Sequence, residues 1–172
     1  GNNSIKTNGI NYKKIFLKVF NIKYISVINL ILLLFAFLRI NHYRQIFLGS
    51  NDKVFDITYK TAFEFIVYSV EEKNFITILG GIMLTIFLIT SITSIIGLFS
   101  KRRVYKLQII LFYLYCIGFT LFSIVYQQSH MQTLYIYSSN YNILLLLAIM
   151  IVSIILIVKG ILNIRNKKLK TN

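Results

Sequence analysis

The chain has 172 residues, 56% of them hydrophobic, and its 19 Lys and Arg against 5 Asp and Glu give a formal net charge of +14. This hydrophobic content excludes a disordered basic tail, because disorder requires low hydrophobicity, and it is unlike that of a soluble nucleic-acid-binding protein. Cys116 is the single cysteine, which excludes an intrachain disulfide and a cysteine-rich metal site. The composition therefore predicts a small integral membrane protein.

The N-terminal segment, residues 1–23, is basic and amphipathic. Phe16, Val19 and Phe20 recur at helical spacing, while nearby lysines can face lipid headgroups. This pattern predicts a short interfacial helix that leads into the first membrane span.

The first candidate span, residues 24–40, is shorter than the roughly 20 apolar residues that a bilayer requires. Lys23 and Arg39 flank its apolar part, and both can extend their charged ends to the interface. A cleaved signal peptide is the alternative, but no small-x-small cleavage site follows. We interpret the segment as a retained span.

The segment that follows, residues 41–74, is predicted to be an outer loop with structure of its own. Apolar residues alternate with others from Phe55 to Val67, and this period of two suggests a strand. A helix lying at the interface, with Asp56 as its N-cap, fits nearly as well.

The second span, residues 75–99, contains no charged residue and carries small side chains at helical spacing. In lipid, such residues allow helices to approach closely. They either pack within the chain's own bundle or dock on a larger membrane partner. The residues of this seam are Thr77, Gly80, Gly81, Thr85, Thr90, Ser94 and Gly97.

The C-terminal half follows the same logic. A basic loop (100–106) precedes a long stretch without Asp, Glu, Lys or Arg, and its polar middle divides this stretch into spans at 107–126 and 141–162. The second outer loop, 127–140, contains a short segment from Leu134 that either pairs as a strand or anchors at the headgroups. Residues 163–172 form a basic tail.

Charge alternates between these segments. Counted with the adjoining Arg39, the first outer loop holds all five acids and five basic residues, and the second holds neither. The N-terminal segment, the basic loop and the tail, counted with the adjoining Lys159, hold the remaining 14 Lys and Arg. By the positive-inside rule, the chain is an all-α, four-transmembrane-helix bundle with both termini cytoplasmic. We expect it in the plasma membrane rather than the ER. The residues expected to contact anionic lipid of the inner leaflet are Lys13, Lys14, Lys18, Lys101, Arg102, Arg103, Lys106, Arg165, Lys167 and Lys168.

The pattern predicts no catalytic, cofactor-binding or metal site. The spans carry no acid, His or mid-membrane Lys or Arg, and the chain has no proline to break a helix, which argues against transport by this chain alone. His42 and His130, with Asp52 or Asp56, are the conceivable metal or pH-sensing set, but their spacing does not select one. Cys116 is expected to be a packing residue within its span.

Four spans, a long first outer loop and a short second one are similar to the plan of claudin-type and other tetraspan proteins. The claudin outer-loop signature of one Trp and two Cys is missing here, so the resemblance is one of topology. Our leading hypothesis is a non-catalytic accessory or modulatory subunit of a larger transporter, pump or complex. The alternatives are a small self-associating channel or carrier and, third, a claudin-like adhesion or scaffold protein. Nucleic acid is not an expected partner, because the basic residues form three juxtamembrane groups without a recognition motif.

Overall fold

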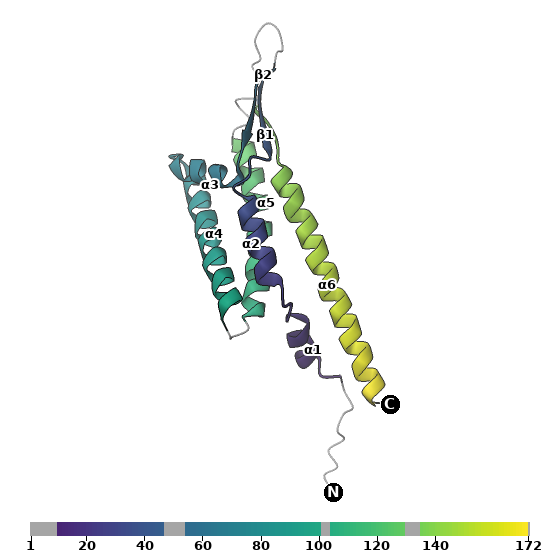
Figure 1. Cartoon of the computed structure of the whole chain (residues 1–172). Helices are drawn as coiled ribbons and strands as arrows, with labels where there is room; N and C mark the ends of the chain where they lie inside the picture. Colours follow the sequence, from purple (N-terminus) through teal and green to yellow (C-terminus); the bar gives the residue numbers. More distant parts are fainter. Residues whose placement is uncertain (1–9, 47–53, 101–103, 130–134, 172) are drawn as a thin grey trace.

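The computed structural model describes residues 10–46, 54–100, 104–129 and 135–171. Three helices are long and apolar enough to cross a membrane: α4 (Phe75–Phe99), α5 (Tyr105–Ser129) and α6 (Asn140–Thr171). A shorter apolar helix, α2 (Ile25–Phe35), lies among them (Figure 1). The chain is thus a multi-pass membrane protein whose spanning part is helical, and α4 has the bounds predicted for the second span.

Within the first predicted span, 24–40, the helix α2 has 11 residues and is shorter than the predicted range. At about 1.5 Å per residue it covers roughly 16 Å, about half of a hydrocarbon core. Turns at both ends keep the adjoining backbone hydrogen-bonded, as lipid requires. Ile25 N donates to Ile22 O at 3.3 Å, and Leu38 N donates to Phe35 O at 3.1 Å.

An antiparallel sheet extends beyond the helices at one end of the molecule (Figure 1). Its strands are β1 (Asn41–Ile46), β2 (Val54–Lys60) and β3 (Tyr135–Ser138), in the order β2-β1-β3. His42 of β1 lies opposite both Tyr59 and Ser138, so β1 joins the two predicted outer loops. Of the two alternatives for the second loop, a strand or a headgroup anchor, the structure shows the strand β3, whereas β1 was not predicted.

The stretch from Phe55 to Val67 is neither one strand nor one helix. It is a strand as far as Lys60, and helix α3 (Ala62–Glu71) then begins. Thr61 is the N-cap, since its Oγ1 accepts the N–H of Glu64 at 3.1 Å. Asp56, the predicted cap, lies inside β2 opposite Gln45.

The buried core lies where α2, α3, α4 and α5 meet, with buried residues of α6 completing it. At its sheet end three rings pack together: Phe37 after α2, Phe63 of α3 and Phe87 of α4, with centroids 4.8 to 5.8 Å apart. The N–H of Phe63 also donates to the carbonyl of Ala36 at 3.0 Å, which attaches the start of α3 to the end of α2. The position of α3 over α4 therefore follows from this junction.

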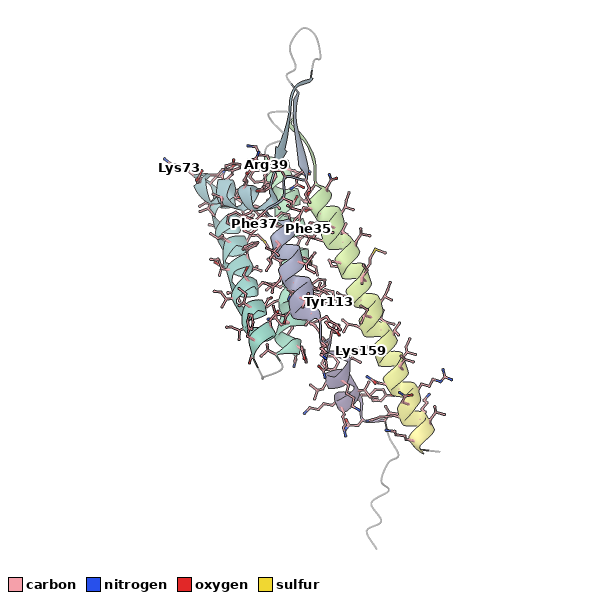
Figure 2. The ribbon with its side chains drawn as sticks, in the orientation of Figure 1. Phe35, Phe37, Arg39, Lys73, Tyr113 and Lys159 are labelled. Carbon is pink, nitrogen blue, oxygen red and sulfur yellow. The ribbon has the colours of Figure 1, made fainter. Side chains whose placement is uncertain are left out.

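The two ends of the bundle differ in charge. The sheet and α3 occupy one end, and the short helix α1 (Tyr12–Val19), the start of α5 and the last turns of α6 occupy the other (Figure 1). Figure 2 shows Arg39 and Lys73 at the sheet end and Lys159 beside α1. The alternation of charge along the sequence thus becomes a separation in space, with the described acids in β2, α3 and the residue after it.

Helix α1 packs along the end of α6. Lys159 Nζ donates to the carbonyl of Asn21 at 2.6 Å, and Lys167 Nζ donates to that of Asn11 at 3.3 Å. The earlier residue, Asn11, contacts the later residue on α6, and Asn21 contacts the earlier one. The two helices therefore run antiparallel. The buried side chain of α1 is Ile15, whereas Phe16 is half exposed.

Candidate functional site

A polar cluster lies inside the bundle and joins three helices. Gln108 Oε1 of α5 accepts hydrogen bonds from Asn29 Nδ2 of α2 at 2.9 Å and from Ser94 Oγ of α4 at 2.8 Å. Asn29 Nδ2 also donates to the Gln108 carbonyl at 3.1 Å. All three side chains are buried, and Gln108 Nε2 has no partner among the described atoms. This cluster fixes how the helices approach each other.

A search of the sequence for charged residues does not find this cluster, because its side chains are uncharged. Asn29 is the one amide within the apolar run of α2, and Gln108 stands in the first turns of α5. An uncharged polar side chain within a span is a usable signal, because it hydrogen-bonds across helices rather than face lipid.

Tyrosines make the second polar contact between helices. Tyr141 of α6 donates its hydroxyl to the carbonyl of Leu32 in α2 at 2.8 Å, and it also bonds the hydroxyl of Tyr115 in α5. Further along, the hydroxyl of Tyr113 (Figure 2) lies 2.7 Å from Ser153 Oγ, and this hydrogen bond connects α5 to α6. Cys116 is a free, buried thiol beside this network.

Four members of the predicted seam on α4 face into the chain's own core: Gly80, Thr90, Ser94 and Gly97. A Cβ on Gly80 would lie 2.6 Å from Ser69 Cβ of α3, and a Cβ on Gly97 would lie 2.6 Å from Ser26 Oγ of α2. Thr90 and Ser94 are buried. This part of the seam brings α3 and α2 close to α4.

Two members of the seam face away from the core. A Cβ on Gly81 meets nothing within 4 Å among the described residues. Thr85, one turn on, is exposed, and its hydroxyl donates to the carbonyl of Gly81 at 2.8 Å. Adjacent residues of a helix point about 100° apart, which is why Gly80 and Gly81 differ. Thr77 is intermediate in exposure, with a buried hydroxyl that lacks a described partner.

We call Gly81 and Thr85, with the apolar residues around them, the outward face of α4. Its large members are all exposed, which distinguishes this face from the buried side of the same helix: Ile78, Ile82, Leu88 and Ile92. Gly81 and Thr85 are the small residues among these bulky side chains.

The residues expected to contact lipid lie at the end opposite the sheet, as far as the structure describes them. Lys13, Lys14 and Lys18 are exposed on α1, and Lys106 is exposed at the start of α5. Arg165, Lys167 and Lys168 follow along the last turns of α6. Lys101, Arg102 and Arg103 lie outside the described residues.

The candidate metal ligands are only partly within the described residues. His42 is in β1 and Asp56 in β2, and their register places them opposite Tyr59 and Gln45. His130 and Asp52 lie outside the described residues. Within the described ranges there is no group of three His, Cys, Asp or Glu side chains that could hold a metal ion.

Comparison of the chain with protein-family models, with curated proteins and with solved structures gives no significant match. Its function is therefore argued from its own geometry.

Proposed function

We propose that the protein is a non-catalytic accessory or modulatory subunit that docks through α4 on a larger integral membrane protein, such as a transporter, pump or complex. The outward face of α4 carries this proposal. Lipid tails are as apolar as leucine, so helices associate in a membrane through close packing and hydrogen bonds. Gly81 and Thr85 offer both, and no other part of the described chain covers them.

The polar interior supports a non-catalytic role. Asn29 and Ser94 both donate to Gln108, and the hydroxyls of Tyr115 and Tyr141 bond each other. These groups hold the bundle together, so they favour a packing role over a substrate or ion pathway.

The separation of charge between the two ends of the bundle supports an orientation with both termini in the cytoplasm. We place α1, the α4–α5 connection and the tail in the cytoplasm, because basic segments are retained on that side. Anionic lipid of the inner leaflet is then the surface that they meet. A plasma membrane location agrees with this assignment.

The substitution Gly81→Leu tests the docking face. Because a Cβ at this position has open space, leucine leaves the fold intact while it places a bulky side chain on the docking face. We expect a stoichiometric partner to co-purify with the full chain in mild detergent and to be lost from the variant by about tenfold or more, which corresponds to roughly 1.4 kcal/mol.

Val158→Leu is the matched control, since it adds bulk to the exposed face of α6 instead. It should retain the partner. A wild-type chain that migrates alone, or a Gly81→Leu chain that keeps its partner, contradicts the proposal. A homo-oligomer that Gly81→Leu dissociates would instead favour the self-associating channel or carrier.

A further inference from the structure

Two basic helices lie along each other at the end opposite the sheet. Neither α1 nor the facing part of α6 contains an acid. Two contacts between them, from Lys159 and Lys167, end on neutral backbone carbonyls. The positive charges on α1 and α6 repel each other. An anion that binds between the two helices therefore stabilises their contact. The basic residues concerned are Lys13, Lys14 and Lys18 on α1 and Lys159, Arg165, Lys167, Lys168 and Lys170 on α6.

A pocket of about 100 Å³ lies between these two helices. Its described lining is Ile15, Lys18, Asn163, Asn166, Lys167 and Lys170. All of these side chains except Ile15 carry N–H donors, three of them on ammonium groups. A phosphate group provides the complementary chemistry, with negative charge and several acceptor oxygens, and charge-assisted hydrogen bonds of this kind are the strong ones.

The depth of the pocket indicates where such a group would come from. The predicted fourth span ends at residue 162, and Asn163 is the first lining residue of α6. From Asn163 to Lys170 the helix rises about 10 Å. The pocket therefore lies just outside the hydrocarbon core, at the level of lipid headgroups.

We propose that the pocket between α1 and α6 binds a phosphate group, and that the bound phosphate holds α1 on α6 by neutralising the lysines that line it. Lys167 binds the phosphate while it keeps its hydrogen bond to the Asn11 carbonyl, because an ammonium group has three donors. The source is an anionic phospholipid or a soluble phosphate. The proposal does not rest on docking through α4, which is a separate face of the molecule.

A disulfide between α1 and α6 measures whether α1 is docked. A Cβ on Gly160 would lie 3.6 Å from Val19 Cγ2, so Val19→Cys with Gly160→Cys is within reach of a bridge. Cys116 is buried and does not compete. The full chain would be placed in phosphatidylcholine nanodiscs, in the same discs with inorganic phosphate, and in discs with one third phosphatidylglycerol. We expect a several-fold higher cross-linking yield in one of the two phosphate-containing conditions.

Charge variants locate the effect. Lys18→Gln with Lys170→Gln removes two lining charges, so its yield should no longer depend on phosphate and should rise in plain phosphatidylcholine, where repulsion limits docking. Lys13→Gln with Arg165→Gln removes the same charge from outside the described lining and should keep the dependence.

The outcomes separate the sources. A gain with phosphatidylglycerol alone identifies a lipid phosphate, and a gain with inorganic phosphate identifies a soluble one; each supports the pocket. Equal yields of the wild-type pair in all three conditions overturn the proposal. So does a control pair that loses its phosphate dependence as fully as the pocket pair, because the effect would then be diffuse attraction to a charged surface.

Discussion

At the scale of single residues, two adjacent glycines on α4 have different roles. Gly80 lies against α3, where a Cβ would meet Ser69 Cβ at 2.6 Å and Val70 N at 3.0 Å. Gly81 faces away from the bundle into open space. The same residue type therefore permits internal packing at one position and faces open space at the next.

Gly80→Ala should destabilise the protein by about 1 to 3 kcal/mol, the usual cost of overpacking, since one of the atoms in its way belongs to the backbone. Gly81→Ala is the matched control and should leave stability unchanged or slightly higher, because alanine favours a helix. Reversible unfolding of both variants in mixed detergent micelles measures the difference. Equal stabilities would show that α3 does not pack against Gly80.

Gln108→Leu should destabilise the protein by about 1 kcal/mol, a typical upper value for a hydrogen bond between helices in a membrane. The substitution removes the side-chain oxygen that accepts hydrogen bonds from both Asn29 and Ser94. Combining it with Asn29→Leu should cost less than the sum of the two single changes, because each removes the same bond. Strict additivity in unfolding free energies would contradict the bond between the two amides.

At the scale of elements, the boundary between β2 and α3 depends on local hydrogen bonding rather than on hydrophobic period. The sequence Thr-Ala-Phe-Glu at Thr61 matches the capping-box pattern, and the Thr61 hydroxyl accepts the Glu64 N–H. The alternation of apolar residues continues through this boundary, which is why period alone merges the two elements.

Thr61→Ala should lower the stability of α3 by about 1 kcal/mol through loss of its N-cap. Faster amide hydrogen exchange in the first turn of α3, with exchange in α4 unchanged, is the expected signature. Thr85→Ala is the control, because that hydroxyl bonds only a carbonyl of its own helix among the described contacts. Exchange that rises equally in both variants would show that Thr61 does not cap the helix.

At the scale of the whole molecule, the charge separation has a direct consequence for accessibility. Glu71 at the end of α3 and Lys170 near the end of α6 are both exposed and lie at opposite ends of the bundle (Figure 1). On intact cells, a membrane-impermeant maleimide should label Glu71→Cys directly and Lys170→Cys only after permeabilisation. The buried Cys116 gives little background. The reverse pattern would invert the proposed orientation.

Long apolar stretches and charge are properties that the sequence by itself determines. In lipid, a helix satisfies every backbone hydrogen-bonding group within its own segment. The 25 uncharged residues of α4 therefore predict that helix. Helices α5 and α6 extend beyond their predicted spans by a few residues or, at the C-terminal end of α6, by a few turns. The described basic segments lie at one end and the described acids at the other, because loop charges alternate along the chain. The small residues of α4 were also visible as a stripe.

The tertiary structure decided what no local pattern contains. β1 lies between its hairpin partner β2 and the distant strand β3, whose pairing no local pattern contains, and the Phe63 N–H of α3 bonds the Ala36 carbonyl just after α2 ends. The stripe on α4 divides into a packed side and an open side only once α2 and α3 are in place. The pocket between α1 and α6 likewise joins residues almost a chain length apart. Periodicity reports which side of a helix is apolar or small, whereas the neighbour that covers it depends on the whole fold.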